Sequence, residues 1–144
     1  MANVIPDSFK TDLLKGTFNF DSSGGSTFKL ALYTDISGLT TSTTAFTATN
    51  EVSTSGTNYS SGGNALTNNG VAVSSNIAFV DFADLTFSSV TLSAVGALIY
   101  KSGGSNEAVL VLDFGGTKTA TNGDFVVQFP TASNSAAIIR LGNA

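Results

Sequence analysis

The chain has 144 residues, of which 42% are apolar, and this length and composition fit one globular domain and exclude an intrinsically disordered chain. It contains neither His nor Cys, which excludes Ser-His-Asp and Cys-His triads, disulfides, zinc fingers and His-based zinc sites. The net charge is −4, with 6 basic and 10 acidic residues, so we expect no nucleic-acid partner because there is no basic patch to neutralise a phosphate backbone.

The N-terminal residues predict one short helix. Its expected span is about residues 7–15, within an N-terminal arm of residues 1–16. The apolar residues that recur at helical spacing there are Phe9, Leu13 and Leu14. Asp7 or Ser8 is placed to cap the start of the helix, and Gly16 is placed to close its end.

Neither a secretory signal nor a membrane span is predicted. The first seven residues lack the basic and apolar stretches of a secretory signal, so we expect no export. The longest apolar run, residues 94–100, is far shorter than the roughly 20 residues that a membrane-spanning helix needs. We therefore expect no membrane partner.

Beyond residue 16 the apolar residues alternate with a period of two. In residues 27–33, Phe28 and Leu30 point one way and Lys29 the other, which predicts a half-buried strand. Further strands are expected at 71–73, 77–82, 85–87, 90–92, 94–101, 108–114, 125–129 and 137–141. Clusters of Gly, Asn and Ser between them predict hairpins at 100–108 and 114–125.

Two of these strands predict the centre of the sheet. Residues 94–100 and 108–114 are apolar on both faces, as strands covered on both sides are. Many short strands with regular turn signals favour an all-β fold, an antiparallel β-sandwich or jelly-roll-like domain with one short N-terminal helix. The expected organisation is the arm of residues 1–16 followed by a single β domain, residues 17–144.

Residues 34–69 are dominated by Ser, Thr, Asn and Gly, with isolated apolar residues such as Phe46 and Tyr59. A structureless segment of this length is uncommon in a compact domain unless it is functional or ordered by a partner. One interpretation makes the segment an interface anchored by these two aromatic residues. The other makes it a long excursion with a short strand or helical turn near residues 50–53 and its aromatic residues in the core.

Four carboxylates near strand ends are the candidates for a calcium site: Asp81, Asp84, Asp113 and Asp124. Their spacing is not that of an EF-hand, and Asp is also a common turn and cap residue. The structural interpretation is favoured, so we expect no metal, no cofactor and no catalytic residue.

Several motifs stand in an order that resembles a family of small bacteriophage virion proteins common in phages of aquatic bacteria. They run nearly from end to end: MAN at residues 1–3, SFK at 8–10, LLKG at 13–16, TFKLALY at 27–33, NEVS at 50–53, Tyr59 with GG at 62–63 and AL at 65–66, AFVDFAD at 78–84, GALIY at 96–100, VLDFG at 111–115, GDF at 123–125 and IIR at 138–140. No single motif is specific, but the ordered set is.

This resemblance implies a non-enzymatic structural protein of the virion, assembled in the host cytoplasm. The expected role is a capsid decoration (cement) protein whose partners are the major capsid protein or other virion proteins. The implied clamps are the arm, with Phe9, Leu13 and Leu14, and the polar segment, with Phe46 and Tyr59. Low charge, 11% of residues, and free sheet edges favour a homo-oligomer, with a trimer as the first expectation.

Two other functions compete with decoration. A tail, neck or fibre component would bind a host surface or other virion proteins through Tyr, Asn and Asp in its loops. An enzyme acting on cell-wall glycan would need a pair of carboxylates, and no pair is singled out by the sequence.

Overall fold

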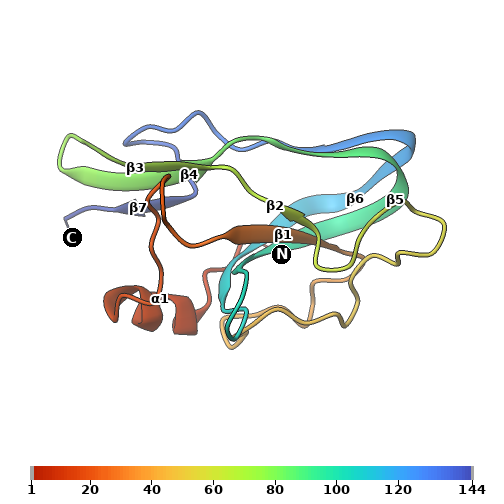
Figure 1. Ribbon diagram of the computed structural model, residues 1–144, viewed down its shortest axis with the longest axis horizontal. Helices are drawn as coiled ribbons and strands as arrows, with labels where there is room; N and C mark the ends of the chain where they lie inside the picture. The colour runs from red at the N-terminus through yellow and green to blue at the C-terminus, as the bar shows by residue number, and fades with distance from the viewer. Residues whose placement is uncertain (1, 144) are drawn as a thin grey trace.

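Two antiparallel sheets and one short helix make up the computed structural model, which describes residues 2–143 (Figure 1). One sheet has the order β2-β1-β5-β6 and the other β3-β4-β7. This confirms the predicted all-β, antiparallel fold with a short N-terminal helix. The elements are α1 (Asp7–Leu14), β1 (Phe28–Tyr33), β2 (Asn64–Ala65), β3 (Asn68–Ser74), β4 (Ile77–Phe82), β5 (Leu85–Lys101), β6 (Ala108–Val127) and β7 (Ile139–Leu141).

Helix α1 begins without the predicted side-chain cap. The N-cap is Pro6, and no side chain caps the first turn, so the expectation for Asp7 and Ser8 was wrong. The polypeptide next to the helix supplies partners instead. The Asp7 N–H donates to the Thr41 carbonyl oxygen over 2.9 Å, and the Ser8 hydroxyl donates to the Thr43 carbonyl oxygen over 3.2 Å. The polar segment, residues 34–69, therefore supplies hydrogen-bond acceptors to the first residues of the helix.

The end of α1 follows the prediction. Gly16 has a φ of 79° and its N–H donates to the Leu13 carbonyl oxygen, while the Thr17 N–H donates to that of Asp12. This pair of bonds is the Schellman motif, which favours glycine at the left-handed position. The helix stops there because the chain turns away through Gly16.

The N-terminal arm is attached to the β body at two points. Phe9 is buried in the core, with its ring centroid 4.9 Å from that of Phe18. Val4 forms an isolated antiparallel bridge with Val111, in which each N–H donates to the other's carbonyl oxygen over 2.9 and 2.8 Å. The arm is thus packed into the same core as the strands rather than lying free.

Strands β5 and β6 form one long, bent ribbon. The segments predicted at 85–87, 90–92 and 94–101 are all part of β5, and β6 runs unbroken through the predicted hairpin at 114–125, which was wrong. Gly115 and Gly116, with φ of 72° and 145°, bulge out of β6 instead of turning the chain back. The pairing with β5 therefore resumes beyond them.

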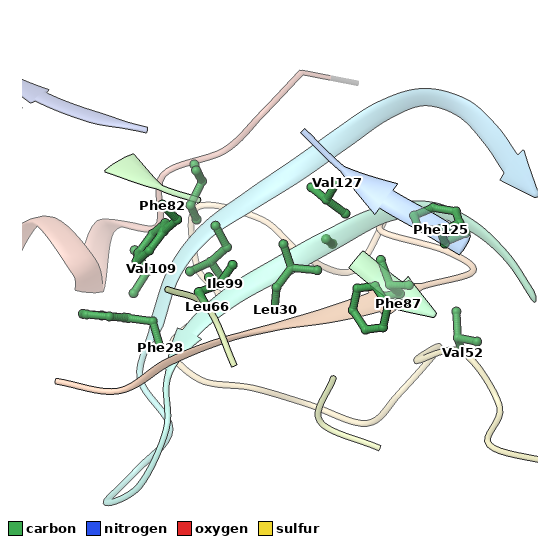
Figure 2. Packing of buried hydrophobic residues seen from close by; sticks show 14 of the residues in the cluster. Phe28, Leu30, Val52, Leu66, Phe82, Phe87, Ile99, Val109, Phe125 and Val127 are labelled. Atoms are coloured by element: carbon green, nitrogen blue, oxygen red, sulfur yellow. The ribbon is translucent and has the colours of Figure 1, made fainter. Parts of the chain in front are cut away.

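The bend lets the ribbon take part in both layers of the molecule. It curves at the right of Figure 1, so that the start of β5 and the end of β6 cover the other halves of the same strands. Figure 2 shows Leu30, Ile99 and Val109 on one side of the main core, with Phe87 and Phe125 on the other. The main core therefore lies between the two halves of the bent ribbon.

The prediction of two central strands holds for β5 and not for β6. β5 lies between β1 and β6, whereas β6 ends the strand order of its sheet. Ala108, Val109 and Val111 are nevertheless fully buried. The Val4 bridge covers the β6 edge and the polar segment covers one face, so burial there does not come from a neighbouring strand.

Strand β1 is buried on both faces, not on one as predicted. Its inner face packs into the main core through Phe28 and Leu30, and its outer face carries Ala31 and Tyr33. The segment that follows β1 folds back over this outer face. Its apolar residues, Ile36, Leu39 and Phe46, belong to a second cluster there. The isolated apolar residues of the polar segment therefore cover the sheet of their own chain.

Candidate binding surfaces

The predicted interface residues are placed differently by the fold. Phe9 and Tyr59 are buried in the main core, and Leu13 packs against it while partly exposed. Phe46 is partly buried, stacked on Tyr100 with a centroid distance of 4.8 Å. Only Leu14 projects into solvent, with 88% of its surface exposed. The core interpretation is thus confirmed for Tyr59, and Leu14 is the one predicted residue that is free to touch a partner.

Tyr59 and Glu51 anchor the polar segment from within. The Tyr59 hydroxyl donates to Glu51 Oε1 over 2.8 Å and accepts from the Leu32 N–H of β1 over 3.0 Å. Burial raises the pKa of Tyr59 far above its usual range, so this hydroxyl stays protonated. The Gly62 N–H and the Ser61 hydroxyl also donate to the Glu51 carboxylate, over 2.6 and 2.9 Å.

The polar segment is thus ordered by its own chain. Glu51 forms a β-bridge with Tyr33, Val52 donates its N–H to Leu32, and β2 pairs with β1. These contacts confirm the interpretation of a long excursion. Near residues 50–53, however, the structure has an isolated β-bridge at Glu51 and not the expected short strand or helical turn. No partner is needed to explain its structure.

The four carboxylates considered for calcium each accept a backbone N–H. The pairs are Asp81 with Phe82, Asp84 with Phe129, Asp113 with Gly115 and Asp124 with Ser89, at 2.8–3.1 Å. Within residues 2–143, no three acidic side chains lie close enough to hold one metal ion. This is how Asp acts in turns and caps.

Asp113 is also poorly suited to acid catalysis. The hydrogen bond from the Gly115 N–H lowers the pKa of Asp113 and favours its ionised form. A glycosidase needs one carboxyl with a raised pKa to protonate the leaving group. Asp81 does have a raised pKa, caused first by burial and then by Asp84, but it is 1% exposed and out of reach of a polymer.

A hollow with several apolar lining residues runs along β6, and we call it the β6 groove. It encloses about 750 Å³. Because β6 bends through both layers, its two halves line the same groove, residues 110 and 112–114 on one side and 124–127 on the other. Asn3 and Ile5 of the N-terminal arm form a further wall. This volume is typical of sites that hold a small molecule or a short peptide segment.

The β6 groove has an apolar floor and a polar rim. The floor includes Leu110, Leu112, Phe114, Phe125, Phe129 and Ile138, and the rim carries Asp113, Lys118, Asp124 and Gln128. Ile5 and Val126 line the groove and are also exposed to solvent. Such a surface suits an apolar segment with polar flanks better than it suits a charged ligand.

A second apolar surface lies at the free end of the three-stranded sheet. The pairings Val73–Ala78 and Ala78–Leu141 place these three side chains in one row on one face. Val71 precedes Val73 by two residues and shares that face. Exposed fractions are 56% for Val71, 71% for Val73 and 57% for Leu141. We call Val71, Val73, Ala78 and Leu141 the overhanging face, because the sheet extends beyond the body at the left of Figure 1.

Neither surface is predicted by the sequence analysis. The β6 groove depends on the bend of a strand that was divided by an expected hairpin at 114–125. For the overhanging face a signal does exist, because Val71-Ala72-Val73 is an apolar run beside a turn-forming Asn-Gly pair. The alternation alone did not show that this end of the strand would leave the core.

Comparison with known proteins adds no relative. No protein-family model, curated protein or solved structure matches this chain. Among residues 2–143, the only α-helix has eight residues, and no helix has the length and apolar character required to cross a membrane.

Proposed function

We propose that the chain is a non-catalytic structural protein of a bacteriophage particle, and that it decorates the capsid by bridging subunits of the major capsid protein. Three features support the proposal. They are the ordered set of motifs that resembles small virion proteins, the absence of His and Cys, and the engagement of the four candidate aspartates in hydrogen bonds to backbone N–H groups. A tail, neck or fibre position is the alternative.

The observation that carries the proposal is the presence of two separate apolar surfaces on one β body. A protein that bridges capsid subunits has to make at least two contacts at once, either both to the capsid or one to the capsid and one to another copy of itself. The β6 groove lies along the bent ribbon, and the overhanging face lies at the free end of the other sheet (Figure 1). A body with a shared apolar core between them keeps the two contacts at a fixed separation.

The β6 groove is the surface that we assign to the capsid. Its apolar floor would take an apolar side chain or a short extended segment, while Lys118 and Asp124 at the rim would bond to the flanking polar groups. One such contact is small. Decoration repeats it over many copies, and multivalent attachment through an oligomer makes dissociation slow even where each contact is weak.

The experiment is a binding assay on particles of the encoding phage from which this protein has been removed. Purified chain should rebind and saturate at a fixed number of copies per capsid subunit. Val126→Lys, which places a charge in the groove, should weaken binding at least about tenfold, a loss of about 1.4 kcal/mol. Thr121→Lys, at an exposed position of β6 outside the groove lining, is the matched control.

Two outcomes would count against this assignment. Equal rebinding by both variants would remove the groove from the capsid contact. Rebinding only at a single vertex, in a few copies, would replace decoration by the tail or neck alternative. Leu14→Lys in the same assay measures what helix α1 adds, since Leu14 is the most exposed apolar residue of that helix.

A further inference from the structure

The overhanging face is the solvent-exposed end of a surface that is otherwise in the core. On β4, the side chains of Ala78, Val80 and Phe82 lie on one face because they are two residues apart. Phe82 and Val80 are buried, and Phe82 packs against Phe28 of β1 at a centroid distance of 5.6 Å. The same face continues outward to Val73, where it meets solvent. The exposed apolar side chains at this end of the face are therefore not covered by any other part of the described chain.

The outer edge of β3 is also unpaired. β3 ends its sheet, and only its beginning is covered, by the Asn68 side chain's bond to the Phe20 carbonyl oxygen and by Ser22 beside Gly70. Beyond Gly70 the edge is open in the part of the chain that the structure describes. This open edge and the apolar face occur on the same strand.

The turn after β3 shows which backbone groups are open. Ser75 and Asn76, with φ of 50° and 64°, form a two-residue turn, which makes Ser74 and Ile77 the hydrogen-bonded pair beside it. Hydrogen-bonded and non-hydrogen-bonded pairs alternate in an antiparallel ladder. The N–H and C=O groups of Val71 and Val73 therefore point outward, away from β4.

Charge does not protect this edge. Natural edge strands are commonly blocked by Lys, Pro or an inward-pointing charge. From Val52 to Val80 the sequence contains no Asp, Glu, Lys or Arg, and β3 contains no Pro. The edge is thus neutral, and two copies of it would meet without the repulsion expected between two chains of net charge −4.

We propose that the partner of this edge is a second copy of the chain, with β3 pairing antiparallel to β3 of the other copy about Ala72. In that register Val71 of one copy lies opposite Val73 of the other, and the outward N–H and C=O groups of both residues bond across the interface. The four valines then lie on one face, because opposed residues in an antiparallel pair point the same way. The two sheets become one sheet of six strands.

The two-fold arrangement also explains the overhang. The tip of each hairpin lies beside the beginning of the other copy's β3, where Asn68 contacts the body. Each overhanging face is thereby placed next to the body of the other copy, which can cover Val73 and Leu141. A single patch that meets itself gives a closed dimer, not the trimer expected from composition. This inference concerns the purified chain and does not depend on the proposed function.

The test is sedimentation of the full chain over a wide range of concentration. We expect the wild type to pass from monomer to dimer, and Val73→Lys to raise the dissociation constant at least about tenfold. Val126→Lys, at an exposed valine of the β6 groove, should dimerise as the wild type does. A wild type that stays monomeric, a trimer, or equal effects of the two variants would overturn the proposal.

A single cysteine gives a second and more specific readout, since the chain has none of its own. In the proposed register, Ala72 of one copy lies opposite Ala72 of the other, next to the two-fold axis. The two residues form a non-hydrogen-bonded pair, in which the Cα atoms are about 4.5 Å apart, and this distance suits a disulfide. Ala72→Cys should form a covalent dimer on mild oxidation, and Thr121→Cys should not. Failure of Ala72→Cys to cross-link faster than this control would overturn the register even if Val73→Lys failed to fold.

Discussion

Replacing Glu51 by Ala should unfold the polar segment from the sheet that it covers. Three donors converge on the Glu51 carboxylate, from Tyr59, Ser61 and Gly62. Tyr59 and Gly62 are buried, so water cannot easily replace the lost acceptor, whereas Ser61 is exposed and can bond to water. The cost therefore comes chiefly from two buried donors.

The size of the loss follows from these two donors. A buried donor left without a partner costs about 1–3 kcal/mol, so the loss of the acceptor of two donors in Glu51→Ala should destabilise the chain by about 2–6 kcal/mol. Glu51→Gln keeps one carbonyl oxygen for both buried donors, Tyr59 and Gly62, and should therefore cost less than half as much. In a chain of this size, a loss of about 1 kcal/mol lowers the melting temperature by about 2–4 °C.

The assay is urea unfolding followed by far-ultraviolet circular dichroism, with the free energy of unfolding extrapolated to water. The control is Asp7→Ala, which removes an exposed ion pair with Lys10 and should cost less than about 1 kcal/mol. A loss for Glu51→Ala no larger than that of the control would refute the reasoning. It would mean that the polar segment is held by its apolar anchors alone.

Three further substitutions test other parts of the fold by the same unfolding measurement. Phe9→Ala removes a ring that is 2% exposed and should cost about 3–5 kcal/mol; a loss below about 1 kcal/mol would show that helix α1 is not part of the core. Gly63→Ala places a Cβ 1.8 Å from a backbone oxygen of β1 and should prevent β2 from pairing with β1. Its control is Gly103→Ala, which has open space around its Cβ and should cost only about 1–2 kcal/mol of unfolding free energy. Equal losses of unfolding free energy in the two variants would contradict the placement of β2. Burial, together with Asp84, raises the pKa of Asp81 above its ordinary 3.8, so the stabilisation that protonated Asp81 provides is complete below about pH 4 and is lost as the pH rises through the raised pKa. Asp81→Asn should therefore gain stability relative to the wild type between pH 4 and pH 7, and a difference that does not change with pH would contradict this.

Local features of the fold could be predicted because they depend on neighbouring residues. Helix α1 and its Gly16 end follow from apolar spacing and from the freedom of glycine to adopt positive φ. Strands β1 and β4 follow from alternation and coincide closely with the predicted ranges. In each case the deciding interactions lie within a few residues along the chain.

The bent ribbon could not be predicted in this way. Gly115 and Gly116 carry the usual signal of a turn, but the pairing of β6 with β5 continues on both sides of them. Whether two glycines make a turn or a bulge depends on a strand that lies far away in sequence. The β6 groove, which exists only because the ribbon bends, was missed for the same reason.

Tyr59 and Phe46 show a related limit. A polar composition around both residues fitted an interface as well as an excursion. The distinction depends on Glu51, whose carboxylate gathers donors from the segment, and on Tyr100, on which Phe46 stacks. Leu14 shows the reverse. It is in the same helix as Phe9, but Leu13, four residues after Phe9, takes the position on the core-facing side, and the next residue, Leu14, points to solvent.

The proposed capsid role is tested most directly by the number and position of copies in purified particles of a phage whose genome carries the gene for this chain, measured by gel densitometry and electron cryomicroscopy. Decoration predicts hundreds of copies on the outer shell, in contact with the major capsid protein through the β6 groove. A few copies at one vertex, or density absent from the shell, would contradict it and assign the chain to the tail, the neck or a fibre.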